Sequence, residues 1–263
     1  MTAGTGTARR HRVIGQGNHS TVYHRPGSPV VMQVFFPDAP ELTVAKVRRE
    51  YLYLRAIFDP VLPGLIPNER MMLPAPAARL CETVVVKDFV QVAPAWSLRI
   101  AARHRLPRQT LDQLAVFTGV VRDLLADTTP VPALHTEASL IPDFIDPPMD
   151  NLVVDTAGQL RLLDTNRLIS TLELRRRHHA GQLLTVACDD TPARIYRLVF
   201  RRLMFLEHRF LRVPAARFRT DPLITRYLHP AQIEALFTVN RPDFRSYREP
   251  CPAVAGRPDS RSA

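Results

Sequence analysis

The sequence predicts an α+β protein built from two lobes, a small β-rich N-lobe followed by a larger helical C-lobe. Two observations support this prediction. Short runs rich in β-branched residues, separated by glycine and proline turns, dominate the first part of the chain. Segments with apolar residues at helical spacing dominate the later part. We therefore expect the N-lobe at residues 10–90, the C-lobe at residues 91–240, and a Pro/Arg-rich tail at residues 241–263.

The N-lobe is expected to begin with an antiparallel meander of three strands joined by turns. A helix should follow, because apolar residues recur there at helical spacing. A Pro-rich connection at residues 60–76, with no element of its own, then leads to the β-branched run TVVVKDFV. The expected strands are residues 12–14, 20–23, 30–35 and 83–90, and the expected helix is residues 41–58.

The C-lobe is expected to follow a short linker at residues 91–94. A proline-broken loop at residues 143–150 leads into a β-hairpin with the sequence LVVDTAGQLRLL, which turns at Gly158. The segments on either side of this hairpin have the apolar spacing of helices. The expected helices are residues 97–104, 110–126, 171–185, 193–211 and 230–239, and the hairpin strands are residues 152–154 and 160–163.

The composition excludes several classes of protein. An apolar content of 46% in 263 residues is enough for a buried core. The sequence has no uncharged apolar run of about 18 residues, so no membrane span is expected, and its first residues lack the apolar segment of a signal peptide. The three cysteines are far apart, which excludes zinc-site and disulfide spacing. We therefore expect a cytoplasmic protein with reduced thiols.

The net charge of +10 is unevenly distributed. From Thr165 to the end there are 18 arginines against 9 acidic residues, whereas the preceding part is almost neutral. Arginine favours bidentate contact with phosphate or carboxylate, so the C-lobe is expected to dock an acidic or phosphorylated acceptor. The alternative is a solvated basic face, and no signature of nucleic-acid binding is present. The expected basic residues are Arg175, Arg176, Arg177, Arg194, Arg197, Arg201, Arg202, Arg209 and Arg212.

Three motifs carry the chemistry. The first, Gly15-Gln16-Gly17, lies between two expected strands, where glycines allow phosphate oxygens to approach the backbone. A dinucleotide-binding βαβ unit is excluded, because a strand rather than a helix follows these glycines. The second motif places Asp146 five residues before Asn151, and the third places Asp164 thirteen residues after Asn151, at the end of the hairpin.

In order and spacing, these motifs resemble those of the protein-kinase-like superfamily, namely the glycine-rich loop, the catalytic loop D-x-x-x-x-N and the metal-binding aspartate. The resemblance covers about residues 13–166. It implies a two-lobed protein-kinase-like fold and phosphoryl transfer that depends on ATP and Mg²⁺. In layout the chain is also similar to small bacterial YrbL-type proteins and, more distantly, to kinases of the lipopolysaccharide inner-core sugars.

The resemblance also implies roles for individual residues. Asp146 would accept the proton of the attacking hydroxyl, and Asp164 would hold Mg²⁺. Asn151 would hold a second Mg²⁺ or shape the loop, and Glu50 would be the glutamate that the family carries on its first helix. The residues expected to bind the nucleotide are Gly15, Gly17, Ser20, Val22, Gln33, Asp88, Val90 and Asn151.

The sequence departs from the family pattern at the lysine that contacts the phosphates, because Gln33 occupies its place. Thr165-Asn166 also replaces the Phe-Gly that follows the metal-binding aspartate. Lys87 is one of only two lysines in the chain, and we hypothesise that it stands in for the missing one as a catalytic residue, paired with Glu50. The alternatives are a lysine whose charged end reaches solvent from an edge position, or one whose N–H groups donate to local carbonyl oxygens.

The predicted function is therefore an atypical ATP- and Mg²⁺-dependent phosphotransferase that acts on a hydroxyl of a protein or of an anionic sugar or lipid. Gln33 favours one alternative, a degenerate kinase-like protein that acts as a regulatory binding module with little or no turnover. A third possibility keeps the carboxylates but transfers adenylate. Because one fold supports many functions, the fold alone does not choose among them.

Overall fold

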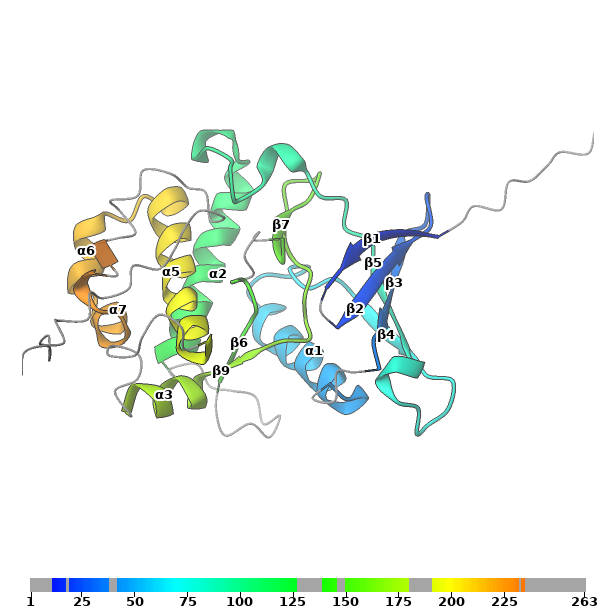
Figure 1. Cartoon of the computed structure of the whole chain (residues 1–263). Helices are drawn as coiled ribbons and strands as arrows, with labels where there is room; N and C mark the ends of the chain where they lie inside the picture. Colours follow the sequence, from blue (N-terminus) through cyan, green and yellow to red (C-terminus); the bar gives the residue numbers. More distant parts are fainter. Residues whose placement is uncertain are drawn as a thin grey trace, which may run out of the picture.

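The computed structural model describes residues 11–17, 19–37, 42–126, 139–145, 150–179, 191–231 and 233–234. A β-sheet from the N-terminal part forms one side of the molecule, and a group of helices from the C-terminal part forms the other (Figure 1). The predicted α+β class, with a β-rich N-terminal part and a helical C-terminal part, is confirmed.

The sheet has five antiparallel strands in the order β1-β2-β3-β5-β4. In β3, Val31, Gln33 and Phe35 are buried and alternate with half-buried residues, as expected for a strand with one face toward the core. The strands are β1 (Arg12–Gln16), β2 (Ser20–His24), β3 (Val30–Phe35), β4 (Glu69–Met72) and β5 (Val84–Asp88).

Strand β4 lies in the Pro-rich connection, where the sequence predicted no element, so that prediction was wrong. Glu69 to Met72 pair with β5 at the edge of the sheet, and Glu69 lies opposite Lys87. A strand of four residues has too short an apolar pattern to identify from sequence, and its pairing with β5 defines it.

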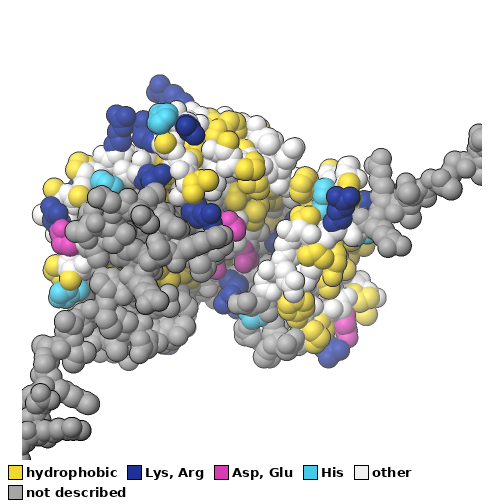
Figure 2. Space-filling model, turned by 45° about the horizontal axis from the view of Figure 1, so that its top comes forward, with side chains coloured by type: hydrophobic (Ala, Val, Ile, Leu, Met, Phe, Trp, Pro, Cys, Tyr) yellow, Lys and Arg dark blue, Asp and Glu magenta, His cyan; other side chains and the backbone are white. Residues whose placement is uncertain are grey.

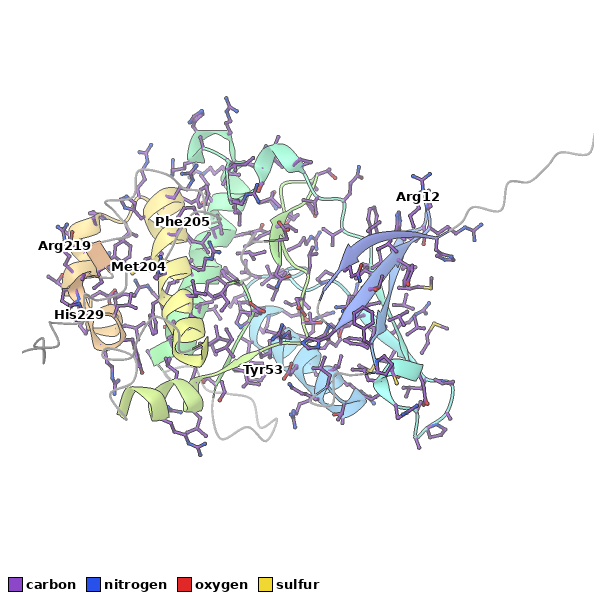
Figure 3. The ribbon with its side chains drawn as sticks, viewed as in Figure 1. Arg12, Tyr53, Met204, Phe205, Arg219 and His229 are labelled. Carbon is purple, nitrogen blue, oxygen red and sulfur yellow. The ribbon has the colours of Figure 1, made fainter. Side chains whose placement is uncertain are left out.

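Helix α1 (Val44–Phe58) connects β3 to β4. Its first residue follows Thr43, whose hydroxyl accepts a hydrogen bond from the Lys46 N–H at 3.1 Å and so caps the helix. The second half of α1 packs into the same core as the helices of the C-terminal part. Tyr53 lies on α1 (Figure 3), and its hydroxyl accepts a hydrogen bond from the Leu140 N–H at 2.8 Å. Helix α1 therefore connects the sheet to the helical part.

The C-terminal part is built around the helices α2 (Arg108–Ala126) and α5 (Thr191–Leu211), which pack against each other. In place of the helix predicted at 97–104, the structure has a turn and a 3-10 helix, so that prediction was wrong. The remaining elements are α3 (Thr171–His179), α6 (Ala215–Thr220), α7 (Pro222–Tyr227), β6 (Leu140–Ile141) paired with β9 (Ile169–Ser170), β7 (Leu152–Val154) paired with β8 (Leu160–Leu162), and the 3-10 helices η1 (Leu80–Glu82), η2 (Pro94–Trp96) and η3 (Arg103–Arg105).

The predicted helices at 171–185 and 230–239 lie partly outside the described residues. In the described part of the chain, no helix has the length and apolar character needed to cross a lipid bilayer.

The main core lies among α1, α2 and α5 and reaches the loop before the β7–β8 hairpin. Phe117 of α2 stacks on Phe58 with ring centroids 5.6 Å apart and meets Phe144 edge-on at 5.6 Å. Phe144 is fully buried and comes two residues before Asp146. Burial of this aromatic ring anchors the start of the predicted catalytic loop.

Candidate functional site

The β7–β8 hairpin brings two of the predicted site residues together. Asn151 directly precedes β7 and Asp164 follows β8 by two positions, so antiparallel pairing places them at the same end of the hairpin. The Leu163 N–H donates to the carbonyl oxygen of Asn151 at 2.7 Å. The Asn151 side chain is held in turn, because its Nδ2 donates to the carbonyl oxygen of Asp143 at 3.2 Å.

The carboxylate of Asp164 is half-buried, and its Oδ1 accepts a hydrogen bond from the Asn166 N–H at 2.9 Å. This local bond orients the side chain, as in an Asx turn. Asp146 lies outside the described residues, so its assignment as the proton acceptor stays a prediction.

The described residues contain no group of three His, Cys, Asp or Glu side chains that could hold a metal ion by themselves. Asp164 has a carboxylate and Asn151 has an amide oxygen, and oxygen ligands suit Mg²⁺. Protein sites for Mg²⁺ commonly supply one or two such ligands and leave the others to water and substrate phosphates. The residues present therefore fit a metal that enters together with a nucleotide.

The glycine turn joins β1 to β2. The Gly17 N–H donates to the Ser20 carbonyl oxygen at 2.9 Å, and Gly15 lies opposite Val22 in the sheet. A Cβ atom at Gly15 would meet the Val22 side chain at 3.8 Å, and one at Gly17 would meet no atom of the described residues within 4 Å. Protein packing thus leaves space at Gly17 that a ligand can use.

Gln33 is uncharged, and both the nitrogen and the oxygen of its side-chain amide form hydrogen bonds within the protein. Its Nε2 donates to the Ser20 hydroxyl at 2.8 Å, and its Oε1 accepts from the Asn166 Nδ2 at 3.4 Å. Gln33 is buried and links β2 and β3 to the segment that follows Asp164.

The predicted pairing of Lys87 with Glu50 was wrong. Lys87 forms its ion pair with Glu69 on the neighbouring strand, with 3.2 Å between Nζ and Oε2. The cation nearest to Glu50 is Lys46, one helical turn away on α1, at 3.8 Å from Oε1. Strand register explains the difference, because Lys87 and Glu69 lie directly opposite each other in the sheet.

Glu50 is a buried carboxylate with only 4% of its surface exposed, and its Oε2 has no hydrogen-bond partner among the described residues. Burial, with a smaller contribution from the negative charge of Asp164, raises its pKa to about 7. The charge of Lys46 and a hydrogen bond from the Leu168 backbone act in the opposite direction. The glutamine at position 33 leaves Glu50 without the lysine that the family resemblance would place beside it.

Removal of the Glu50 charge should change how stability depends on pH. Because the folded-state pKa lies above the ordinary value of 4.5, the folded protein binds more protons than the unfolded chain between these two pH values. The contribution of the protonated Glu50 side chain to the free energy of unfolding is therefore fully present below pH 4.5 and is lost as the pH rises through 7. We expect the free energy of unfolding to fall less steeply with pH in Glu50→Gln than in the wild type over this range. The two slopes should differ by at most about 1.4 kcal/mol per pH unit.

Urea unfolding of the metal-free protein at several pH values measures this slope. Glu82→Gln is a surface control with the opposite sign, because hydrogen bonds from the backbone and side chain of Arg79 lower the pKa of Glu82. Parallel curves for the wild type and Glu50→Gln would contradict the prediction.

The connection between the two parts contains Asp88 and Val90. Asp88 accepts a hydrogen bond from the Asn68 Nδ2 at 2.8 Å, which points its side chain toward the surface of the sheet edge. The ring of Phe89 stacks on His24 at 3.9 Å. Within the described part of the chain, the Val90 N–H has no hydrogen-bond acceptor. This N–H is therefore available to a ligand.

The predicted basic face of α5 was wrong at two positions. Arg201 and Arg202 are buried, with 4% and 2% of their surfaces exposed. Arg209 donates through Nη2 to the Ala101 carbonyl oxygen at 2.9 Å. Arg201 and Arg202 therefore lie in the interior of the helical part, whereas Arg209 is half-buried. The side chains of Arg194 and Arg197 lie outside the described ones.

Figure 2 shows a hollow between the two halves of the molecule, with acidic side chains visible on its wall. A separate cavity of about 400 Å³ lies between the start of α1 and η1, and none of the predicted site residues lines it. This cavity therefore lies apart from the candidate site.

Sequence reasoning missed Glu69 altogether. The only indication of Glu69 in the sequence was the general rule that a buried lysine requires a paired acid. The family resemblance suggested Glu50 as the acidic partner of Lys87. No motif in the Pro-rich connection indicated that Glu69 would take this place.

Comparison with known proteins gives distant likenesses among solved structures only. No protein-family model matches the sequence, and no curated protein matches it. Among solved structures, a choline/ethanolamine kinase family protein from Mesorhizobium loti is similar over 92% of this chain and 92% of its own length. The sequence identity is 15% and the TM-score is 0.32.

Proposed function

We propose that the protein is an ATP- and Mg²⁺-dependent phosphotransferase of an atypical kinase-like type. The observation that carries the proposal is the placement of Asn151 beside Leu163, immediately before Asp164, by the 2.7 Å backbone hydrogen bond. The two residues lie at the same end of the hairpin, in the order of the family motifs. The sheet order and the position of α1 between β3 and β4 are consistent with this reading.

The nucleotide is proposed to lie between the glycine turn and the end of the hairpin. The backbone at Gly15 and Gly17 would contact phosphate oxygens, and the Val90 N–H would contact the base. Asp164 and Asn151 would hold Mg²⁺, which neutralises phosphate charge when it is bound. Asp146 would take the proton of the acceptor hydroxyl.

The acceptor is proposed to be anionic. Arg167, three residues after Asp164, and Arg176 on α3 are both exposed, so a phosphate or carboxylate can reach them. Arginine binds such groups in a bidentate manner. A protein, sugar or lipid with an acidic group near the reacting hydroxyl fits this arrangement.

A second candidate function, a binding module without turnover, is favoured by one observation. The amide of Gln33 is engaged by Ser20 and Asn166, so β3 offers no cation to the phosphates. Nucleotide binding without measurable transfer to any acceptor would support this candidate.

Thermal unfolding with and without ATP and Mg²⁺ tests whether a nucleotide binds. A ligand present at a hundredfold excess over its dissociation constant stabilises the folded state by about 2.7 kcal/mol. For a chain of this size, each kcal/mol raises the midpoint by about 2–4 °C. We expect a rise of several degrees for the wild type.

Gly17→Val provides the matched variant for this experiment. Its side chain would enter space that the protein leaves open, so the unliganded midpoint should stay within about 1 °C of the wild type, as for a surface substitution. The rise caused by the nucleotide should disappear. An unshifted wild type at millimolar ATP would reject the proposed function.

A further inference from the structure

The segment that carries Asp164 is tied to the sheet by a buried cluster of Lys87, Glu69 and Thr165. The Thr165 hydroxyl donates to Glu69 Oε2 at 2.9 Å. Lys87 Nζ donates to the Thr165 hydroxyl at 3.2 Å and to the Leu163 carbonyl oxygen at 3.4 Å. These contacts hold the residues on both sides of Asp164.

All three hydrogen-bond donors of the Lys87 ammonium have a protein acceptor. An ammonium group has three N–H donors, and the acceptors are Glu69, Thr165 and the Leu163 carbonyl oxygen. Lys87 therefore has no donor left for a phosphate, so it does not replace the phosphate-contacting lysine that Gln33 displaces.

Because this cluster is buried, its side chains are fixed in one arrangement. The side chains of Lys87 and Glu69 are 10% and 3% exposed, and Thr165 is 1% exposed. A buried ion pair persists only where hydrogen bonds compensate for lost hydration, so neither side chain is free to swing away. The cluster is thus a fixed connection between the sheet and the hairpin.

Gln33 adds a second connection one residue further along. Its Oε1 accepts from Asn166 Nδ2 at 3.4 Å, while its Nε2 is fixed by Ser20. Side chains from β3, β4 and β5 therefore hold residues 163, 165 and 166, and Asp164 lies between them.

We propose that Lys87 and Glu69 are positioning residues, which fix the Asp164 segment through Thr165 and replace the apolar anchor expected after this aspartate. The functional consequence of this inference rests on the proposed function. In that case the metal–nucleotide complex binds an Asp164 carboxylate that the protein already holds in place. Lys87 itself contacts neither phosphate nor metal.

Hydrogen exchange of the full-length, unliganded protein tests the connection without any nucleotide. Thr165→Val removes the hydroxyl at nearly constant volume, and Thr165→Ser retains it. We expect amide exchange in residues 162–168 to become at least about tenfold faster in Thr165→Val and to stay close to the wild type in Thr165→Ser. Exchange in α2 should be unchanged in both. Unchanged exchange in Thr165→Val would overturn the proposal.

The double variant Lys87→Met/Glu69→Met removes both charges together and so avoids an unpaired buried charge that would unfold the protein. We expect it to fold and to show the same faster exchange in residues 162–168. Its affinity for ATP with EDTA should match the wild type, while the gain on adding Mg²⁺ should fall about tenfold. An equal loss with and without Mg²⁺ would mean that Lys87 contacts phosphate and would overturn the proposal.

The two readouts separate this proposal from the proposed function. A wild type that binds no nucleotide rejects the function, and hydrogen exchange still decides whether the cluster holds the segment. A wild type that binds ATP and Mg²⁺ while all the variants exchange like the wild type retains the function and rejects the positioning role.

Discussion

Asp164→Asn is expected to remove the Mg²⁺-dependent part of nucleotide binding. The substitution keeps the size of the side chain and its acceptor for the Asn166 N–H, but it removes the negative charge that would hold the metal. Interactions with a charged group contribute about 1.5–3 kcal/mol, so the affinity for ATP with Mg²⁺ should fall by roughly 10- to 100-fold. Isothermal titration with ATP in Mg²⁺ and in EDTA measures both affinities.

Asp112→Asn is the control for this substitution, because Asp112 lies on α2 with 71% of its side chain exposed and forms only a long contact of 3.9 Å with Arg108. It should leave both affinities unchanged. If Asp164→Asn binds ATP with Mg²⁺ as tightly as the wild type does, the metal assignment fails. A complete loss of phosphate transfer to any acceptor should accompany the loss of metal dependence.

Arg122→Leu is expected to be the most destabilising of the substitutions considered. Arg122 on α2 donates to Glu207 Oε2 on α5 at 2.7 Å and to Asp221 Oδ2 at 2.8 Å. The hydrogen bonds that it donates to Glu207 raise the pKa of Arg122, so the guanidinium is charged at every accessible pH. Removing it leaves the buried Glu207 carboxylate without its cation, and breaking such a pair costs about 3–5 kcal/mol.

The effect should extend to α7, because Asp221 also caps that helix by accepting a hydrogen bond from the Leu223 N–H at 2.9 Å. Urea unfolding measures the loss. Arg108→Leu on the same helix is the control, since its side chain is 95% exposed and its loss should cost less than about 0.5 kcal/mol. Equal stabilities for the two variants would show that the buried cluster contributes nothing.

The local features of the fold were predictable because the sequence encodes them over short distances. The alternation of apolar residues in β3 and the helical spacing in α1 depend only on neighbouring positions. The hairpin that brings Asn151 beside Leu163 was predictable for the same reason, because Gly158 and two short apolar strands define it. The order and spacing of the motifs along the chain were therefore sufficient to identify the candidate site.

Two features depended on the tertiary structure. The arginines of α5 have the spacing of a solvated face, yet Arg201 and Arg202 face the interior. Their burial depends on which elements pack against that face, and helical periodicity does not specify the packing partner.

The partner of Lys87 was likewise decided by tertiary structure. Sequence reasoning identified Lys87 as a lysine that needs an acid, and family analogy chose Glu50, but the register of β4 against β5 places Glu69 opposite it. Register between strands depends on long-range pairing and on the burial of one sheet face, whereas motif spacing describes only the order of residues along the chain. The sequence by itself therefore determined the motifs and most of the elements, although not β4. The packing of the sheet against the hairpin decided which side chains hold the residues on either side of Asp164.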